Sequence, residues 1–458
     1  MRRPGIALTA SSLAFALVLL DTTVVNVALP AIRDDLGASV SGLQWVVNGY
    51  TLVLAALLLS AGALADRLGA RRMMRVGVAI FAVASSAAAL APSTATLVAA
   101  QVLLGAGAAA LVPASLTLLT HAYPDPIRQA RAVGIWAAIS ASAFAAGPVL
   151  GGLLVDAVGW RLVFAVNLPF AAAIALLLWR GVGETSRVAR RGLDLAGQAT
   201  AIVALASLTF ALIASRSLGW GSPLVAGGLV LAVVAGVTFV AVERRGRAPM
   251  LPLRLFSSRA FSASTAAGSL INFALYGEFF LLSLYFQDVR GLSALETGLA
   301  FLPQPLVFAL AGIPAGRLVA RIGPRWPLAI GGALAAVGTF LLLGAGPDTP
   351  YSQLVISLML FGAGGGAAIP ALTAAAVSAA PPEQVGVAAA ALNASRQTGG
   401  VLGVAVLGGM AHAGPQFVSG MHAGLAIAAA ALTATAVLGL GLGASRRPAR
   451  TELEPAQA

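Results

Sequence analysis

The sequence predicts an all-α polytopic membrane protein with fourteen transmembrane helices, arranged as two six-helix halves and two inserted helices. Three observations indicate this fold class. Of the 458 residues, 59% are hydrophobic and only 10% are charged, whereas about a quarter of residues are charged in soluble domains. Apolar runs of about 20 residues recur from end to end, and each can cross a hydrocarbon core roughly 30 Å thick. Short segments of the first half also return in the second.

Hydropathy places the individual spans. The N-terminus "MRRPGIALTA" has the basic start of a signal peptide, but the apolar segment after it is too long and contains Asp21, so we interpret it as an uncleaved first helix. The predicted spans are residues 6–28, 44–65, 74–91, 96–119, 131–155, 161–180, 194–215, 223–242, 260–287, 297–319, 326–345, 352–376, 385–411 and 417–443.

The distribution of basic residues supports this count and sets the orientation. All 28 basic residues are Arg, and nearly all of them lie between the apolar runs or at their ends. With the N-terminus inside, Arg396 falls within a span, Arg33, Arg161, Arg216 and Arg290 lie outside, and the other 23 lie in cytoplasmic segments. This asymmetry follows the positive-inside rule. We therefore expect a multi-pass protein of the inner (cytoplasmic) membrane with both termini in the cytoplasm, and no nucleic-acid partner despite the net charge of +12.

The composition excludes several chemistries. Without Lys, the chain has neither a phosphate-binding GxxxxGK[ST] loop nor a Schiff-base lysine, and without Cys it has no disulfide or thiolate chemistry. No nucleophile stands beside a base, so we expect no enzyme activity and no cofactor. His121, His412 and His422 are single residues in loops or helix ends, so we expect no metal site.

An internal repeat relates the two halves. "GALADRLGARR" at 62–72 returns as "GRLVARIGPRW" at 316–326, "GAGAAALVP" at 105–113 as "GAGGGAAIP" at 362–370, and "GPVLG" at 147–151 as "GGVLG" at 399–403, with offsets of 254, 257 and 252 residues. Helices 2, 4 and 5 thus pair in order with helices 10, 12 and 13. Parallel halves related in this way place a substrate site at their interface, near the middle of the membrane.

These pairings predict four segments. The boundaries follow from the spans and from the charged connections between them. They are an N-terminal half (1–191), an inserted pair of helices 7 and 8 (192–247), a C-terminal half (248–445) and a cytoplasmic tail (446–458).

Several motifs in this order resemble the major facilitator superfamily, specifically its fourteen-helix drug:proton antiporter branch. "LDTTVVNVALP" at 20–30 is similar to the branch signature in helix 1, and "GALADRLGARR" to the loop between helices 2 and 3. "AGPVLGG" at 146–152 resembles the antiporter signature in helix 5, and "GWRLVFAVNLP" at 159–169 is typical of the branch. The resemblance covers essentially the whole chain and implies the major facilitator fold.

The helix 4 motif departs from the family pattern. The family carries an Arg and a Gln four and one residues before the first Gly, whereas "QVLLGAGAA" has Gln101 and Leu104 there. The membrane-embedded Arg often credited with assisting proton coupling is therefore absent.

The resemblance also assigns gating roles. In the family, the Asp of the helix 2–3 loop holds the other half on the cytoplasmic side, so Asp66 is a gating candidate, and glycines allow a tight turn there. In "AGPVLGG", Pro148 removes a backbone hydrogen bond and predicts a bend in helix 5. The gating candidates are Gly62, Asp66, Arg67, Gly69, Arg71 and Arg72, and the helix 5 motif comprises Gly147, Pro148, Gly151 and Gly152.

Asp21 is the first candidate for proton coupling. A carboxylate within the bilayer costs roughly 2.5–3.5 kcal/mol on insertion scales, so it must face protein or a wet cavity, and a desolvated carboxyl group binds a proton readily. The alternative is a packing role, in which the carboxylate caps a neighbouring helix or forms hydrogen bonds with Thr22 and Asn26.

Glu278 and Arg396 are the other ionisable residues that lie well inside predicted spans, away from the span ends. Glu278, deep in helix 9, is a candidate second proton site or an anchor for a cationic substrate; alternatively it reaches outward water near Asp288 and Arg290. Arg396, in helix 13, could act on either carboxylate, bind an anionic group or close a gate, and the alternative is that it extends to the cytoplasmic face.

Together these features predict proton-coupled efflux of multiple drugs or antibiotics by alternating access. We expect a monomer that transports small, amphiphilic and preferentially cationic substrates. The alternatives are a narrow-specificity metabolite exporter or importer of the same fold and a transport-inactive sensor. The predicted substrate cavity contains Asn26, Gln101, Asn272, Glu278 and Arg396.

Overall fold

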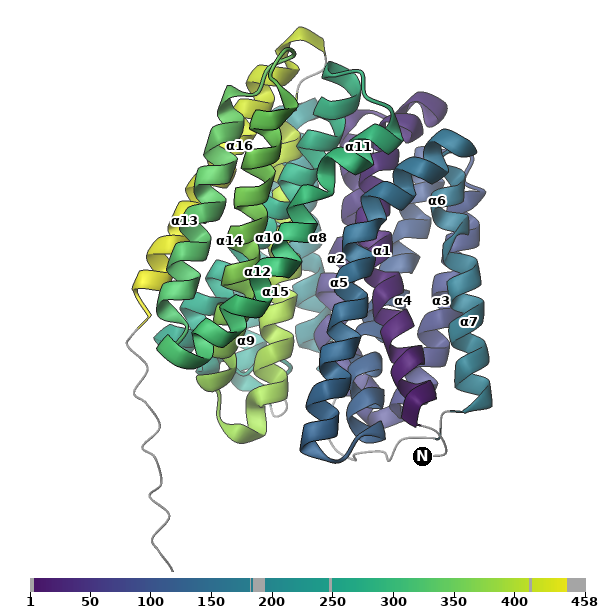
Figure 1. Ribbon diagram of the computed structural model, residues 1–458, viewed down its shortest axis with the longest axis vertical. Helices are drawn as coiled ribbons and strands as arrows, with labels where there is room; N and C mark the ends of the chain where they lie inside the picture. The colour runs from purple at the N-terminus through teal and green to yellow at the C-terminus, as the bar shows by residue number, and fades with distance from the viewer. Residues whose placement is uncertain (1–3, 182, 184–193, 247–248, 412–413, 443–458) are drawn as a thin grey trace, which may run out of the picture.

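The computed structural model describes residues 4–181, 183, 194–246, 249–411 and 414–442. The predicted tail, 446–458, and His412 lie outside the described residues, as do the predicted boundaries at 191/192 and 247/248. The described chain is almost entirely helical, and its long helices run side by side in one bundle (Figure 1).

The helices follow the predicted order. The first half contains α1 (Pro4–Leu36), α2 (Val40–Leu68), α3 (Ala70–Ala89), α4 (Thr94–Ala122), α5 (Pro126–Ala157) and the consecutive α6 (Arg161–Ala165) and α7 (Asn167–Arg180). The inserted pair is α8 (Leu195–Leu218) and α9 (Pro223–Arg245). After the 3-10 turn η1 (Leu253–Ser257), the second half contains α10 (Arg259–Leu284), the π-helical turn η2 (Tyr285–Val289), α11 (Ala294–Phe301), α12 (Pro303–Ile322), α13 (Arg325–Leu341), α14 (Tyr351–Ser378), α15 (Val385–Met410) and α16 (Phe417–Leu440), with 3-10 turns at Leu342–Gly344, Pro382–Gln384 and Gly414–Gln416.

Each predicted span corresponds to a helix or to consecutive helices. Thirteen of the described helical segments meet the length and hydropathy expected of a bilayer span. The fourteenth, α15, has 26 residues and is therefore about 39 Å long, and Arg396 lies in its interior. Many helices are longer than their predicted spans because hydropathy marks the lipid-facing core, whereas charged residues such as Arg33 and Asp34 extend α1 into water.

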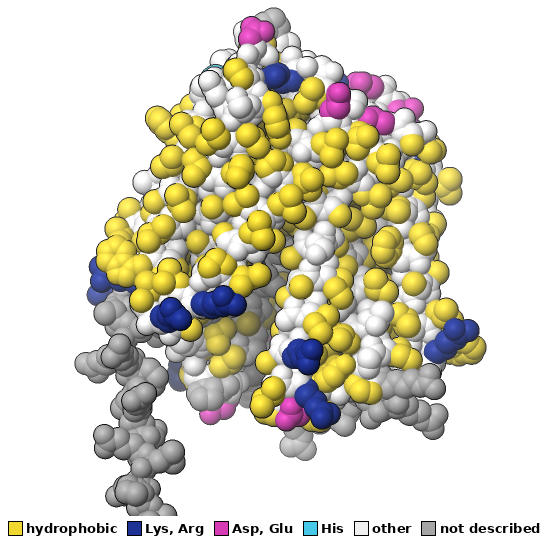
Figure 2. Space-filling view, viewed as in Figure 1, with side chains coloured by type: hydrophobic (Ala, Val, Ile, Leu, Met, Phe, Trp, Pro, Cys, Tyr) yellow, Lys and Arg dark blue, Asp and Glu magenta, His cyan; other side chains and the backbone are white. Residues whose placement is uncertain are grey.

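The surface has the polarity of a membrane protein. Hydrophobic side chains cover the middle of the face shown in Figure 2, Arg side chains gather at its lower end, and most acidic side chains lie at its upper end. We call the end that carries the turns at Gly69 and Gly323 the Arg-rich end, and the other the opposite end. Both glycines have positive φ, 92° and 81°, so the repeated turn has the same left-handed backbone in the two halves.

Repeat-related glycines set the helix packing. A Cβ at Gly147 of α5 would overlap Thr23 of α1, and a Cβ at Gly399 of α15 would overlap the Ser269 carbonyl of α10. Without a hydrophobic driving force between helices in lipid, such close backbone approach supplies much of the association energy. The repeated "GPVLG" and "GGVLG" segments therefore join corresponding helices in each half.

Gly399→Ala should destabilise the fold, because the added methyl group must displace α10, and overpacking of this kind costs about 1–3 kcal/mol. Gly386→Ala, in the same helix, is the matched control: no atom lies within 4 Å of its Cβ position, and replacing a helical glycine by alanine gains about 0.5–1 kcal/mol. Thermal unfolding of the purified protein, followed by tryptophan fluorescence, measures both. Equal melting temperatures for the two variants would contradict the packing argument.

Candidate transport site

A cavity of about 780 Å³ lies between the halves at the Arg-rich end. Its walls come from α1, α2, α4 and α5 on one side, and from α15 and the segment before η1 on the other. Phe15 and Trp136 stack within it, with ring centroids 4.4 Å apart. Its ionisable lining residues, among the described part of the chain, are all acidic: Asp66, Asp194 and Glu383. The cavity thus offers an aromatic surface and negative charge.

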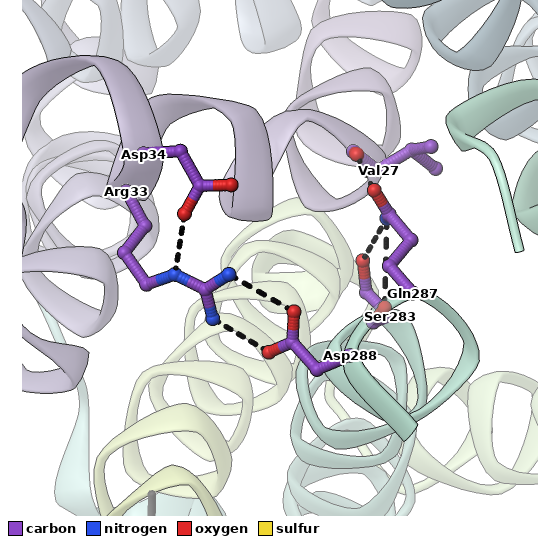
Figure 3. A network of polar contacts seen from close by, with 6 residues as sticks. All are labelled: Val27, Arg33, Asp34, Ser283, Gln287 and Asp288. Carbon is purple, nitrogen blue, oxygen red and sulfur yellow. Dashed lines mark hydrogen bonds and ion pairs between the residues drawn. The ribbon is translucent and has the colours of Figure 1, made fainter. Parts of the chain in front are cut away.

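At the opposite end the two halves are in contact (Figure 3). The Arg33 guanidinium of α1 donates to both carboxylate oxygens of Asp288 in η2, at 2.6 and 3.0 Å, and also bonds Asp34. The amide of Gln287 donates to the Val27 carbonyl at 3.0 Å. Because both interactions join α1 to the end of α10, they hold the first helices of the two halves together.

Three further contacts close this end. The Ser283 hydroxyl donates to the Asn26 carbonyl at 2.5 Å, and the Gln44 amide of α2 donates to the carbonyls of Val404 and Ala405 in α15, at 2.8 and 3.0 Å. The third contact joins α5 to α11: the Asp156 carboxylate accepts the N–H groups of Ala294 and Leu295, at 3.2 and 2.9 Å. That geometry is favourable, since a helix N-terminus carries partial positive charge. The structure is therefore open at the Arg-rich end and closed at the opposite end.

The helix 5 motif takes part in this closure. A Cβ at Gly151 would meet Val24 of α1, and a Cβ at Gly152 would overlap the Ala294 carbonyl of α11. On the facing helix, a Cβ at Gly298 would overlap the Pro148 carbonyl. Pro148 lies within the continuous helix α5. The small residues thus allow α5 to pack directly on the other half, in addition to any bend that Pro148 introduces.

Asp21 lies further along α1 than Phe15 and is 1% exposed. Its Oδ1 accepts a hydrogen bond of 2.6 Å from the Asn167 amide of α7, which also donates to the Ser85 hydroxyl of α3 at 3.2 Å. Its Oδ2 is buried and has no hydrogen-bond partner among the described residues. The side chain therefore points away from the cavity, toward the outer helices of its own half.

The expected packing partners of Asp21 bond elsewhere. The hydroxyl of Thr22 donates to the Val18 carbonyl at 2.7 Å, and the Asn26 amide donates to the Thr22 carbonyl at 3.1 Å. The expected hydrogen bonds from Thr22 and Asn26 to the carboxylate are therefore not formed, and its described partner is instead Asn167 on α7.

Glu278 has a similar environment in the second half. It is fully buried on α10; its Oε2 accepts a hydrogen bond of 3.1 Å from the Thr339 hydroxyl of α13, and its Oε1 has no partner among the described residues. The alternative in which Glu278 reaches outward water is therefore wrong.

The repeat explains the resemblance between these two sites. Asp21 and Glu278 are 257 residues apart, and the hydroxyl-bearing Ser85 and Thr339 are 254 residues apart, offsets already found between the repeated motifs. Each half thus has one buried carboxyl group on its first helix, a hydroxyl group on its third helix, and one carboxyl oxygen without a donor among the described residues.

The other predicted cavity residues are dispersed. The Arg396 Nε donates to the Asn272 Oδ1 across the α15–α10 contact at 3.4 Å, so Arg396 does not extend to the cytoplasmic face. Asn26 lies at the closed interface, and Gln101 of α4 is buried, with its side-chain oxygen lacking a partner among the described residues. With Glu278 buried toward α13, these five residues do not line the cavity at the Arg-rich end.

The predicted gating loop is a tight turn at the cavity mouth. Gly69 closes α2 and opens α3 with its positive φ, and Gly62 and Asp66 line the cavity. Arg71 donates to the Leu178 carbonyl near the end of α7, at 3.0 and 3.2 Å, which suits a cation at a helix C-terminus. Arg67 and Arg72 are exposed.

Sequence reasoning missed several residues of these sites. Asn167 lies within the quoted motif "GWRLVFAVNLP", where a lone amide in an apolar run was an available signal. Thr339 could have been found by applying the repeat offset to Ser85. Asp156 and Gly298 carry no such signal, because their importance arises only where α5 meets α11.

Comparison with known proteins agrees with this architecture. The sequence model of the Major Facilitator Superfamily matches residues 11–305 and 304–457. The chain is 38% identical to the methylenomycin A resistance protein of Streptomyces coelicolor over 408 residues, covering 89% of this chain and 86% of the relative. It is 38% identical to the multidrug resistance protein Stp of Mycobacterium tuberculosis over 403 residues (88% and 75%), and 39% identical to the puromycin resistance protein pur8 of Streptomyces alboniger over 397 residues (85% and 78%).

Solved structures share the fold. A bacterial homologue of the human lysosomal transporter Spinster, inward-facing and unoccupied, superposes with a TM-score of 0.66 at 18% identity, covering 95% of this chain and 96% of that one. A POT family transporter in complex with a thioalcohol-conjugated peptide gives a TM-score of 0.71 at 15% identity, covering 95% of each chain. The chain belongs to the major facilitator superfamily, and the prediction of its drug:proton antiporter branch is confirmed.

Arg33→Gln should shift the protein toward opening at the opposite end, because it breaks an ion pair between the halves. The two side chains are 33% and 28% exposed, so the pair is worth up to about 1 kcal/mol and the ratio of states should change by up to about fivefold. The chain has no Cys, so spin labels can be attached at Leu90→Cys in the first half and Asp348→Cys in the second. Double electron–electron resonance then measures the distance between the two halves at the opposite end.

Arg161→Gln is the matched control, because it breaks the 2.5 Å pair with Asp35 within the first half. Its distance distribution should match the parent. An unchanged distribution in Arg33→Gln would show that the Arg33–Asp288 pair does not bias closure.

Proposed function

We propose that this chain exports small amphiphilic molecules from the cytoplasm in exchange for protons, by alternating access. The observation that carries the proposal is the arrangement of the two ends: a cavity at one end of the interface, contacts between the halves at the other, and a buried carboxyl group behind the interface in each half. Its relatives named for resistance to methylenomycin A, puromycin and multiple drugs support efflux as the direction.

The Arg-rich end faces the cytoplasm in this proposal. The positive-inside rule places the turn that carries Arg67, Arg71 and Arg72 there, in the inner membrane. The first described residues of α1 and the last described residues of α16 lie at this end (Figure 1), which supports the proposal that both termini are cytoplasmic. The structure then corresponds to the inward-open state, ready to accept substrate from inside.

Asp21 and Glu278 are the proposed proton-coupling residues. Neither carboxyl group lines the cavity, so protons act through helix packing rather than by displacing substrate directly. A proton on Asp21 Oδ2 would neutralise α1 where it packs on α3 and α7. When Asp21 is deprotonated, its negative charge is stabilised by the hydrogen bond from Asn167, the donor among the described residues. The packing of α1 would therefore depend on whether Asp21 carries a proton.

The driving force is sufficient for export. One charge that crosses 100 mV supplies roughly 2.3 kcal/mol, which sustains a concentration gradient of roughly fifty-fold at about 1.4 kcal/mol per decade. Coupling requires that protonation and substrate binding favour opposite states. Substrate binds from inside to the deprotonated protein, and protonation from outside favours its release.

The cavity supports a preference for cationic amphiphiles. The Phe15–Trp136 stack offers an aromatic surface on which an organic cation gains about 0.5–2 kcal/mol. The ionisable residues of its described lining, Asp66, Asp194 and Glu383, are all acidic, which favours cations over anions. The cavity forms within one chain, so we propose a monomer as the functional unit.

The remaining predicted residues would act when the opposite end opens. Asn26 contacts Ser283 in the closed interface, so separation of α1 from α10 would expose it to substrate. Asn272, Arg396 and Gln101 are proposed to line the same path nearer the middle of the membrane. In this scheme the turn that contains Asp66 and Gly69 forms part of the cytoplasmic gate, which closes when the opposite end opens.

Asp21→Asn should abolish substrate-triggered proton release from energised everted vesicles given ethidium, because Asn cannot carry the proton. Glu278→Gln should lower the number of protons moved per substrate. Both are measured with a pH-sensitive dye inside the vesicles. Asp125→Asn, the same chemical change at the exposed N-cap of α5, is the control. A full response in Asp21→Asn would place coupling elsewhere.

Trp136→Ala should raise the KM for ethidium by about 3- to 10-fold with little change in maximal rate, because the ring contributes binding energy of the cation–π type. Initial transport rates in the same vesicles measure both parameters. Trp179→Ala, at a ring that is 77% exposed on α7, should leave KM unchanged. Equal KM values in the two variants would remove the aromatic pair from the substrate site.

A further inference from the structure

The inserted helices α8 and α9 bring two acidic side chains together at the cavity mouth. Asp194 is the N-cap of α8, and Glu243 lies in the last turn of α9. Glu243 is only 3% exposed, although α9 as a whole is the least buried of the long helices. Asp194 also lines the cavity. The proton-coupling scheme above uses neither residue.

Each carboxylate uses one oxygen for a backbone contact. Asp194 Oδ1 accepts the Gly197 N–H at 2.7 Å, and Glu243 Oε2 accepts the Leu251 N–H at 3.1 Å. The other oxygens, Asp194 Oδ2 and Glu243 Oε1, are buried and have no hydrogen-bond donor among the described residues. A Cβ placed at Gly197 would lie 2.6 Å from the first and 2.8 Å from the second, so both point to the same small space.

Among the described residues, neither carboxylate takes part in an ion pair. Arg244 and Arg245, which follow Glu243 on α9, are exposed. Along the rest of the cavity wall, the described ionisable residues are Asp66 and Glu383, which are acidic as well. Two carboxylates whose facing oxygens are buried at close range repel each other strongly, so a cation between these oxygens stabilises the pair.

The available oxygens favour a proton over a metal ion. Ca²⁺ takes six to eight oxygen ligands and Mg²⁺ requires octahedral coordination, whereas this site offers one free oxygen from each carboxylate. A single proton satisfies both oxygens at once, because one carboxyl donates and the other accepts.

We propose that Asp194 and Glu243 bind one shared proton between Oδ2 and Oε1, forming a proton site on the inserted helices that is separate from Asp21 and Glu278. This proposal does not depend on the direction or substrates of transport.

The site links proton binding to the position of the inserted helices. Gln198, four residues after Asp194, donates to the Ala56 carbonyl of α2 at 2.8 Å and accepts from Ser60. Glu243 holds the chain that leads into the second half through Leu251. Loss of the shared proton would make the two carboxylates repel each other. This repulsion would weaken the contact between α8, α9 and the segment that contains Leu251.

Dicyclohexylcarbodiimide tests the proposal on the full-length protein in detergent. This reagent adds to protonated carboxyl groups in apolar surroundings and leaves a stable acylurea, which peptide mass spectrometry locates. At neutral pH, Glu243 or Asp194 should be labelled about tenfold more than the exposed cavity residue Glu383, and the label should fall as the pH rises. Labelling equal to that of Glu383 would overturn the proposal.

Variants separate a shared proton from simple burial. Asp194→Asn should sharply reduce labelling of Glu243, because an amide at residue 194 can donate to Oε1 and stabilise the carboxylate. Undiminished labelling of Glu243 in that variant would mean that the proton is not shared. Glu243→Gln, which can still accept from Leu251, should likewise reduce labelling of Asp194, and its gel-filtration profile checks folding.

Two further arms complete the test. Protection of the wild-type pair by added Mg²⁺ or Ca²⁺ at constant pH would show a metal site and overturn the proton assignment. In the double variant Asp21→Asn, Glu278→Gln, the labelling of Glu243 should persist, whereas its loss would show that the pair is not a separate site. Because labelling needs neither substrate nor a proton gradient, its failure is distinct from a failure of the vesicle experiments.

Discussion

The contact between the two halves at the opposite end is the interaction on which the rest of this structure depends. It combines close backbone packing at Gly152 and Gly298 with the Arg33–Asp288 ion pair and the capping of α11 by Asp156. Where backbones approach this closely, even one added methyl group would overlap the neighbouring helix, whereas each polar contact contributes only a small stabilising free energy. This combination suits a moving part, because the packing defines the closed geometry and the weak polar contacts let it open.

The buried carboxyl groups are arranged by the same internal symmetry. Asp21 and Glu278 each lie on the first helix of a half, facing outward from the interface and bonded to a side chain from a peripheral helix. In a bilayer, polar groups of this kind must find their partners within the protein. The two sites are not identical: Asp21 has an amide donor at 2.6 Å, whereas Glu278 has a hydroxyl donor at 3.1 Å. The halves therefore supply similar but chemically distinct surroundings for their buried carboxyl groups.

Much of the fold follows from the sequence, because hydropathy, the Arg distribution and the repeat each depend on short segments. The same holds for the burial of Asp21, since a lone carboxylate in an apolar run must be shielded from lipid by the protein. What the sequence could not reveal is which way such a side chain faces. Glu278 was expected to line the cavity or reach water, yet the rotation of α10 directs it toward Thr339. Gly298 and Asp156 gain their importance only from contacts between distant segments, about which local patterns carry no information.

The separation between the cavity and the buried carboxyl groups has a consequence for adaptation. Phe15, Trp136 and Glu383 can be exchanged without touching Asn167, Ser85 or Thr339, because the two groups of residues lie on different helices and turns. A population under selection by a new toxic compound could therefore change the cavity lining through one or two substitutions while the surroundings of the buried carboxyl groups are inherited unchanged. This modularity offers a physical reason why proteins built on this plan could diverge readily in the compounds to which they confer resistance.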